Sequence, residues 1–317
     1  MVNDRLYIEA GELSTHSRFE NLLAYALHAS KYEKEILINF SRTQGIWSHF
    51  ILKENPLEDY DLPENIKFGA SLSRCADERV GICSYGTPGY SLCRKIKNKP
   101  SRYIVKFDEG SGSWQSKVAL YKIFFREGVK IRGFRYASKK VMRKALSDLN
   151  YLLGAPLIQN WSWFASANPL VRNELLVESL KELYSLKLPK KKVCAELVFL
   201  TSPWVELGYC SKDYYLKEVY RLIMMLSAGN AIIKPHPGED LRKYEGMPFE
   251  VYRENESIES AVGSGAIITK KVVGEASTAL ITMHLLFGTE SYRHHPIVKA
   301  PISGVFKKAL SEFVIEI

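Results

Sequence analysis

Short apolar runs alternate with longer amphipathic segments along this 317-residue chain. The runs EILINFS (35–41) and RYIVKF (102–107) are continuous and rich in β-branched or aromatic residues. Runs of this kind are typical of strands that are buried on both faces, in a parallel sheet covered by helices. The pattern therefore predicts an α/β protein.

The first part of the chain predicts alternating strands and helices. The strands are expected at 5–11, 35–41, 79–86 and 102–107. The helices are expected at 18–30, 89–98, 117–125, 139–153 and 174–186. Ser17 is the expected N-cap of the first helix, with Glu20 at the capping-box position.

The stretch SLKLPKKKV (185–193) interrupts the alternation with a proline and a run of lysines, and it is the expected linker. After it, strands are expected at 194–203, 231–237, 249–254 and 266–271, and helices at 211–229, 257–265 and 277–288. Two such halves predict two facing Rossmann-like domains, 1–187 and 188–317. Ligands of such sheets bind beyond the carboxyl ends of the strands, so the expected site is the cleft between the domains.

Composition restricts the class of protein. Hydrophobic residues make up 46% of the chain and charged residues 25%, as in ordinary globular proteins. No apolar run reaches the roughly 18 residues of a membrane span, and the N-terminus lacks the pattern of a secretory signal. The five cysteines form no C-x-x-C pair, which argues for reduced thiols and against a zinc site. We therefore expect a cytoplasmic protein without a metal ion or cofactor.

The net charge of +9 is unevenly distributed, because the segment from Arg126 to Lys144 holds eight basic residues and a single acid, Glu127. Such a patch attracts phosphate-rich partners, among them the anionic inner face of the plasma membrane, which we expect to be contacted peripherally. A solvated helix face accounts for the charge as well. Only Phe134 and Tyr136 interleave aromatic rings with these charges, so nucleic acid is not an expected partner.

Three groups of residues with candidate chemistry follow predicted strands. Asp108 and Glu109 come directly after the strand 102–107, and Gly110 allows a tight turn. One of these carboxylates has the chemistry to take a proton from an attacking hydroxyl group. A plain turn is the alternative.

His236 follows the predicted strand that ends at Lys234, and prolines stand on both sides of it. The prolines restrict the backbone, so the imidazole is held with little loss of entropy. A fixed imidazole can assist a leaving phosphate, as an acid when protonated or as a hydrogen-bond donor when neutral. A turn histidine is the alternative, since a second pair, His295-Pro296, lies in a polar stretch where no strand is expected.

Gly274, Ser277 and Thr278 lie where a strand or loop gives way to the apolar helix 277–288. Backbone N–H groups at a helix start, together with hydroxyl groups, form a phosphate site. The alternative is an ordinary helix N-cap.

The order of these groups resembles that in bacterial sialyltransferases of the lipooligosaccharide and polysialic-acid capsule type. That family carries an acid-acid-Gly motif, then a His-Pro motif, then a Ser-Ser/Thr motif, which here are Asp108-Glu109-Gly110, His236-Pro237 and Ser277-Thr278. The helix at 257–265 also resembles the segment in which those enzymes place a glutamate on the nucleotide ribose, which here is Glu259. The resemblance covers roughly residues 103–280.

The resemblance implies a GT-B fold and the metal-independent, inverting transfer of sialic acid from CMP-sialic acid to a surface glycan. Domain 1–187 is then the acceptor side and 188–317 binds the donor. The implied catalytic residues are Asp108 or Glu109 as base and His236 as the group that assists the departure of CMP. The implied donor-binding residues are Gly110, Lys234, Pro237, Glu259, Gly274, Ser277 and Thr278.

One branch of the family takes its base from an aspartate after a Gly-Ser-Pro turn, and here Trp204 stands in that place. This departure favours Asp108 or Glu109, with Glu206 in reserve. Alternatives are another CMP-releasing enzyme, such as a Kdo transferase or a CDP-glycerol glycerophosphotransferase, and a non-catalytic protein that binds an anionic surface or nucleic acid.

Overall fold

The computed structural model describes residues 5–13, 16–42, 59–68, 79–85, 102–107, 125, 129, 133–153, 158–163, 173–188, 191–227, 229–298 and 304–317. The chain divides into two compact units. The first unit comprises Met1–Thr43, Leu62–Ser179 and Ser303–Val305, and the second comprises Gln44–Asp61, Leu180–Ile302 and Phe306–Ile317.

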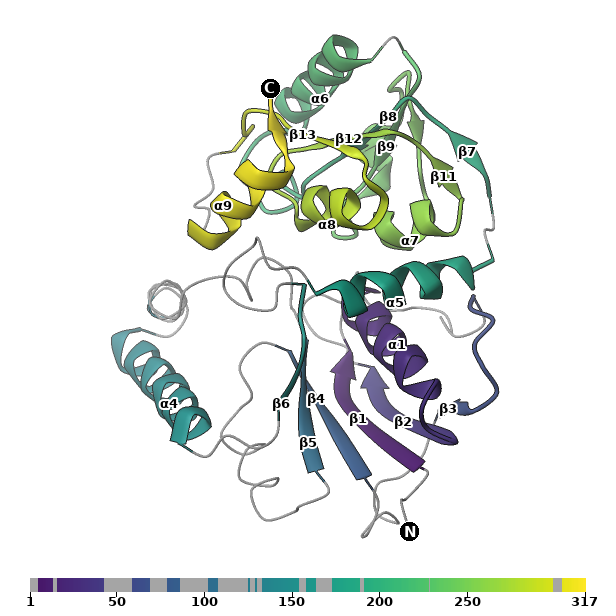
Figure 1. The fold of residues 1–317 in the computed structure, drawn as a ribbon. Coiled ribbons are helices and arrows are strands. Elements are labelled where there is room, and N and C mark those ends of the chain that lie inside the picture. The colour runs from purple at the N-terminus through teal and green to yellow at the C-terminus, as the bar shows by residue number, and fades with distance from the viewer. Residues whose placement is uncertain are drawn as a thin grey trace. The chain divides into compact units, whose positions relative to one another are not determined.

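The first unit contains a six-stranded sheet in the order β3-β2-β1-β4-β5-β6 (Figure 1). Its strands are β1 (Arg5–Leu13), β2 (Glu35–Arg42), β3 (Ile66–Phe68), β4 (Arg79–Tyr85), β5 (Arg102–Phe107) and β6 (Ile158–Trp161). Every neighbouring pair is parallel. This is the strand order of a Rossmann sheet.

Within the described residues, the helices that belong wholly or partly to this unit are α1 (His16–Ser30), α4 (Phe134–Leu153) and α5 (Glu174–Ser185). α1 packs on β1, β2 and β3. The contact is apolar because Leu22 and Leu23 of α1 and Ile36 and Ile38 of β2 are fully buried. Tyr25 of α1 also forms a buried hydroxyl–hydroxyl hydrogen bond of 2.8 Å with Tyr103 of β5.

The second unit contains a second six-stranded parallel sheet, in the order β10-β9-β8-β12-β13-β14. Its strands are β8 (Leu197–Leu200), β9 (Ala231–Lys234), β10 (Glu250–Val251), β12 (Lys271–Gly274), β13 (Glu290–Arg293) and β14 (Ile315–Glu316). A separate parallel pair is formed by β7 (Val193–Cys194) and β11 (Ile267–Ile268). Numbered by their order within the sheet, the six strands repeat the Rossmann order of the first unit.

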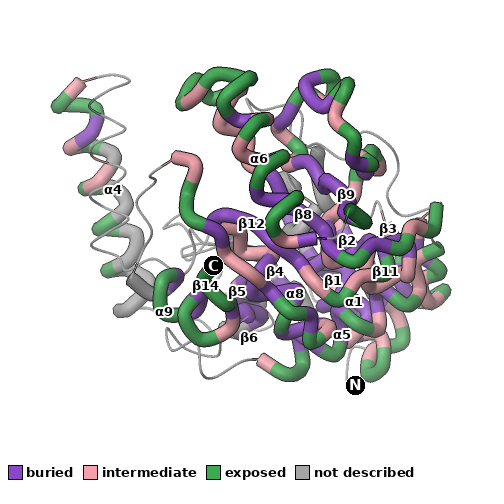
Figure 2. Tube along the Cα trace, turned by 90° about the horizontal axis from the view of Figure 1, so that it is seen from above, coloured by how far each residue is buried: buried purple, intermediate pink, exposed green. Residues whose placement is uncertain are grey.

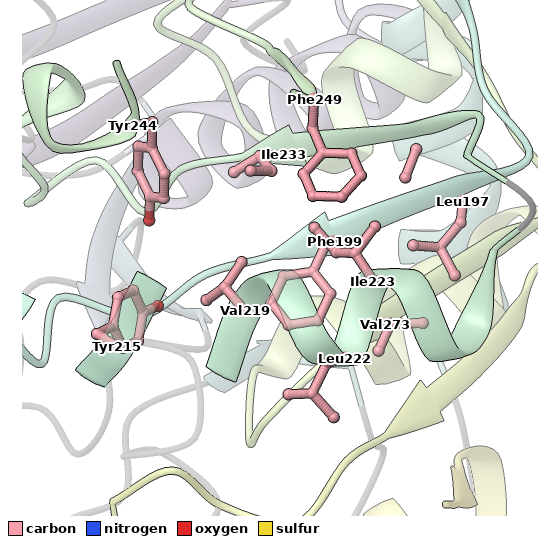
Figure 3. Packing of buried hydrophobic residues seen from close by; sticks show 11 residues of the cluster. Leu197, Phe199, Tyr215, Val219, Leu222, Ile223, Ile233, Tyr244, Phe249 and Val273 are labelled. Carbon is pink, nitrogen blue, oxygen red and sulfur yellow. The ribbon is translucent and has the colours of Figure 1, made fainter. Parts of the chain in front are cut away.

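The helices of the second unit are α6 (Lys212–Leu226), α7 (Ile258–Gly263), α8 (Thr278–Phe287) and α9 (Gly304–Phe313), with a 3₁₀ turn, η4, at Leu241–Tyr244. Val219 and Ile223 of α6 pack against Phe199 of β8 and Ile233 of β9 in one buried cluster (Figure 3). All four residues of β8 and of β9 are buried, as the tube in Figure 2 shows for these strands. These are the continuous apolar runs that the sequence marks as two-sided strands.

Most of the predicted elements are confirmed within the described residues. The strands at 35–41, 79–86 and 102–107 and the helices at 18–30, 174–186 and 211–229 are present, within a few residues at each end. The helix expected at 139–153 begins earlier, at Phe134. The helix expected at 89–98 and all of that at 117–125 except its last residue lie outside the described residues.

The expectation that no strand precedes the second His-Pro pair was wrong. His294, the residue before the pair His295-Pro296, directly follows a strand, β13. The sequence of this strand, ESYR, has no apolar pattern from which a strand could be predicted. The strand is defined by main-chain pairing with β12, from Lys271↔Glu290 to Gly274↔Arg293. The predicted domain boundary lies at 187/188. The two compact units divide earlier in the chain, between Ser179 and Leu180, inside α5.

Candidate active site

The loop after β9 folds back on its own backbone. The backbone N–H of His236 donates to the Glu239 carboxylate at 2.6 Å and lies 3.3 Å from the Thr201 hydroxyl. The N–H of Glu239 donates in turn to the carbonyl of His236 at 2.9 Å. His236 is therefore fixed two residues beyond the carboxyl end of a buried strand, where parallel sheets present their functional groups.

The same turn selects the tautomer of His236. The N–H of Gly238 donates to Nδ1 of His236 at 3.2 Å. Because a backbone N–H can only donate, Nδ1 is the acceptor, and the ring proton of the neutral imidazole is on Nε2. Burial, and to a smaller extent the charge of Lys234, lower the pKa of His236 to about 4. At neutral pH, His236 is thus an uncharged Nε2–H donor.

Glu239 anchors this loop, and the sequence analysis did not identify it. Its side chain has an exposed fraction of 0%, and its Oε1 pairs with Lys243 Nζ at 2.5 Å and accepts from the Tyr244 hydroxyl at 3.0 Å. The Thr201 hydroxyl donates to the other carboxylate oxygen. Burial raises the pKa of Glu239, against the opposing charge of Lys243. The glutamate three residues after a histidine held by prolines, with a lysine four residues further on, is the signal that could have identified it.

A pocket of about 580 Å³ lies beside this loop and is lined by three of the predicted site residues, Lys234, His236 and Pro237. Residues after β10, among them Tyr252 and Glu254, form another part of its wall. The Lys234 ammonium donates to the Glu254 carbonyl at 3.3 Å and lies 5.4 Å from the centre of the Tyr252 ring. Burial lowers the pKa of Lys234 to about 8, so most of this lysine is still charged at neutral pH.

The predicted phosphate cradle lies at another strand of the same sheet. A Cβ atom on Gly274, the last residue of β12, would come within 3.3 Å of the Leu200 Cβ, so glycine suits this close approach of β12 to β8. Ser277 is the N-cap of α8, and its Oγ accepts from the Ala279 N–H at 3.2 Å. Thr278 is the first residue of the helix. These three residues do not line the described pocket.

Glu259 lies in the first turn of α7, and its carboxylate accepts a hydrogen bond from the Thr282 hydroxyl of α8. Burial raises the pKa of Glu259. It too does not line the described pocket. The structure thus brings Lys234, His236 and Pro237 together at the described pocket. Glu259 lies apart from them on α7 and is hydrogen-bonded to α8, the helix that Ser277 caps.

Trp204, which stands where one branch of sialyltransferases has its base, serves a different purpose. Its indole N–H donates to the Glu275 carboxylate at 2.5 Å, which joins the loop after β8 to the loop after β12. The Val298 N–H donates to the other oxygen of Glu275 at 3.2 Å. Burial raises the pKa of this glutamate. Trp204 therefore fixes the two central loops, at the point where the strand order of the sheet reverses.

The predicted base lies outside the described residues. The described segment of β5 ends at Phe107, and the next three residues are Asp108, Glu109 and Gly110. What is described is β5, the parallel strand whose carboxyl end precedes them. The reserve candidate, Glu206, pairs with Lys243 Nζ at 3.1 Å and accepts from the Asp240 N–H at 3.0 Å. The identity of the base stays a prediction.

Two features are absent from the described part of the chain. Its histidine, cysteine and acidic side chains nowhere gather in a group of three or more suited to a metal ion. Its helices are too short or too polar to cross a membrane.

Comparison with known proteins gave no match in sequence: no protein-family model and no curated protein matches the chain. Solved structures match in fold. A putative UDP-N-acetylglucosamine 2-epimerase from Listeria monocytogenes is 8% identical with a TM-score of 0.51, over 97% of this chain and 83% of its own. A 2,6-sialyltransferase from Photobacterium sp. JT-ISH-224, solved with CMP and lactose, is 11% identical with a TM-score of 0.50, over 98% and 78%.

The GT-B domain of a sialyltransferase from Photobacterium damselae also matches, with 11% identity and a TM-score of 0.44 over 98% of this chain and 99% of its own. Identities this low concern the fold alone. Together with the two Rossmann-ordered sheets, the fold likeness to the Listeria protein and to the sialyltransferase from Photobacterium sp. JT-ISH-224 shows an α/β protein of the GT-B type.

Proposed function

We propose that this protein is an inverting glycosyltransferase that moves sialic acid from CMP-sialic acid to a glycan of a bacterial surface polysaccharide or lipooligosaccharide, without a metal ion. The observation that carries the proposal is His236, a neutral Nε2–H donor fixed at a strand end beside a pocket in a Rossmann-ordered unit. The fold likeness adds that a sialyltransferase solved with CMP and lactose is built on this architecture.

In the proposed reaction, a carboxylate of Asp108 or Glu109 takes the proton of the acceptor hydroxyl. The oxygen attacks the anomeric carbon of sialic acid from the face opposite to CMP, and the bond from that carbon to the phosphate oxygen breaks. Negative charge then grows on the phosphate. A donor already aimed at this charge stabilises the transition state, because it needs no reorganisation during the reaction.

The pKa of about 4 favours one of the two roles open to His236. An imidazole that is neutral at pH 7 donates a hydrogen bond to the departing phosphate and has no extra proton to transfer. CMP is a good enough leaving group for this, since its phosphate is already a weak base. The Lys234 ammonium, which lines the same pocket, supplies positive charge.

The remaining roles are those that the resemblance to the sialyltransferases implies. The hydroxyl groups of Ser277 and Thr278, with the start of α8, bind the phosphate. Gly274 keeps β12 close to β8 at this point, and Pro237 holds the loop of His236. Glu259 binds the ribose from α7.

The proposed location is the cytoplasmic face of the membrane, which presents lipid-linked acceptors. Support comes from α4, which covers the second half of the basic segment 126–144. Arg135 and Lys139 of this helix are exposed. Apolar side chains of the same helix are exposed as well: Phe134, Met142, Leu146 and Leu149. A basic helix with an exposed apolar stripe fits an anionic bilayer surface.

Vesicle sedimentation tests this location. Replacing Lys139, Lys140, Arg143 and Lys144 with glutamine should release the protein from phosphatidylserine vesicles, as should raising the salt above 0.1 M, where the Debye length is about 10 Å. Vesicles of phosphatidylcholine alone are the control. Binding of the variant that equals wild-type binding would refute the location without touching the proposed reaction.

A donor panel tests the reaction itself. The purified protein is incubated with CMP-sialic acid, CMP-Kdo, CDP-glycerol and UDP-sugars, and donor hydrolysis and thermal stabilisation are measured. CMP-sialic acid should be hydrolysed slowly, and CMP should stabilise the fold, because it binds only the native state. Hydrolysis of CDP-glycerol or a UDP-sugar in its place would refute the proposal.

A further inference from the structure

The loop of His236 depends on a buried charge that the proposed reaction does not use directly. Glu239 is fully buried, and its ion-pair partner Lys243 is only 4% exposed. Burying an ion pair costs several kcal/mol per charge unless hydrogen bonds compensate, so apolar residues would serve stability equally well. A purely structural role therefore gives little reason for a carboxylate here.

The partners of Glu239 suggest what the carboxylate does. Oε1 pairs with Lys243 and accepts from the Tyr244 phenol, whose pKa is raised by burial, so that it keeps its proton. Oε2 accepts from the Thr201 hydroxyl and from the backbone N–H of His236. Three of the four donors hold the carboxylate, and the fourth is the residue whose imidazole the reaction needs.

We propose that Glu239 is the positioning residue of His236: its clamped carboxylate fixes the turn 236–239 and thereby the tautomer and orientation of the imidazole. The turn brings the Gly238 N–H onto Nδ1, which leaves the ring proton on Nε2. Glu239 is among the residues around the pocket, but its side chain is fully buried, so its carboxylate acts through the backbone of the loop. The inference rests on the proposed function only for its consequence in catalysis, since the effect on the imidazole is independent of the substrate.

The two ways in which Glu239 can influence His236 have opposite signs. The charges that face His236 are Lys234 and Lys243, which lower its pKa, and Glu206, which raises it. If Glu239 acted only as a charge, its loss would leave Lys243 less compensated and lower the pKa of His236 further. If Glu239 acts by position, its loss frees the loop, hydrates the imidazole and raises the pKa toward the ordinary value.

The test is histidine-selective ¹⁵N NMR of wild type and Glu239→Gln between pH 4 and 8. The chain has seven histidines, and His236→Ala assigns the signal. Wild type should show the Nε2–H tautomer. Glu239→Gln should show mixed tautomers and a titration midpoint raised by about one unit or more. CMP affinity, measured by calorimetry, should fall about tenfold.

The matched control is Glu256→Gln. Glu256 is another carboxylate of this unit that is clamped by a lysine, Lys187 at 2.6 Å, and by the Tyr252 hydroxyl, without contact to His236. Its replacement should lower stability and leave the tautomer of His236 unchanged. Should Glu239→Gln fail to fold, Tyr244→Phe removes one donor to Oε1 and is judged by the same signals.

The proposal is overturned if the tautomer and midpoint of His236 stay as in wild type in Glu239→Gln, or if the midpoint falls. It is overturned as well if Glu256→Gln changes them equally. Failure of wild type to bind CMP would refute the proposed function instead, and the NMR signals would still decide the role of Glu239.

Discussion

Two loops of the second unit carry a His-Pro pair, and both follow parallel strands of one sheet, β9 and β13. In the loop after β9, Nδ1 of His236 accepts from a backbone N–H, so the ring donates through Nε2 beside a pocket. In the loop after β13, Nδ1 of His294 lies 2.7 Å from the carbonyl of His295, which can only accept, so Nδ1 carries the proton. His294 is 2% exposed and stacks on Phe199, with 5.4 Å between the ring centres.

The comparison shows that a His-Pro dipeptide alone does not define the candidate site. The histidine of the second pair, His295, is exposed, and its neighbour His294 serves the core. The first pair has a proline on each side of the histidine, followed by Gly238 and the clamped Glu239. What distinguishes the two loops is therefore the segment after each pair, which in one case turns back to hold the ring.

Replacing the first histidine should have the largest effect. His236→Ala removes a hydrogen bond that is strongest in the transition state, so we expect kcat to fall roughly 10²–10³-fold. CMP affinity should fall as well, since a hydrogen bond to a charged group is worth about 1.5–3 kcal/mol. Steady-state transfer and calorimetry measure the two effects.

His295→Ala is the matched control, because His295 also belongs to a His-Pro pair in a loop after a strand of the same sheet. It should leave transfer and CMP-dependent thermal stabilisation unchanged. Equal losses in the two variants would show that the choice between the His-Pro pairs is wrong.

Substitution of the carboxylates after β5 should lower transfer without the loss of CMP affinity expected for His236→Ala. Asp108→Asn or Glu109→Gln should lower transfer by roughly 10²–10⁴-fold, the usual contribution of a general base. CMP affinity should stay near that of wild type, because the base touches the acceptor and not the nucleotide. If both variants retain transfer, the base lies elsewhere and Glu206 is the next candidate.

Replacing the buried histidine of the second loop should affect stability and not transfer. His294→Ala removes the stack on Phe199 and leaves a cavity, so we expect a loss of about 1–3 kcal/mol in the free energy of unfolding. Urea unfolding measures this loss. Transfer per folded molecule should equal that of wild type, and a selective loss of transfer would give the second loop a part in the reaction.

The sequence was a good guide to the fold wherever side chains report burial. EILINFS and RYIVKF became β2 and β5, and their apolar residues report burial correctly, since Ile36 and Ile38 of β2 and Ile104 and Val105 of β5 are fully buried. β6, with the sequence IQNW, and β13, with ESYR, were missed because each is short and its polar residues prevent a continuous apolar run, while main-chain pairing defines the strand. Turn composition gave no signal for them either.

The sequence also located part of the wall of the described pocket, while the roles of these residues stay predictions. Lys234, His236 and Pro237 could be identified because a strand end and two prolines are visible locally. Glu239 was missed although His236, Lys243 and Tyr244, three of its partners, lie within five residues of it. The roles of Thr201 and Trp204 could not be identified, because they arise from contacts between loops that are far apart in the chain. Thr201 and His236 are separated by 35 residues and Trp204 and Glu275 by 71. Such contacts are set by the strand order of the sheet.

The smallest expected effect is on the pH dependence of stability, and here the two loops should behave alike. The pKa of His236 is lowered from 6.5 to about 4, mainly by burial, and burial lowers the pKa of His294 as well. Below the ordinary pKa of 6.5 the unfolded chain takes up a proton at each of these positions, while the folded chain stays neutral. Protons then favour the unfolded state, so stability falls as the pH drops from 6.5 toward 4.

Urea midpoints of wild type and the three histidine variants, measured at pH 7 and pH 5, sharpen the comparison. His236→Ala and His294→Ala should each lose less stability between the two pH values than wild type, because each removes one group that protonates only on unfolding. His295→Ala, which removes the exposed histidine of the second loop, is measured alongside as the control. A pH dependence of His236→Ala equal to that of wild type would mean that His236 already titrates normally in the folded protein. It would then carry a proton to transfer, and its role as a neutral donor to the phosphate would be wrong.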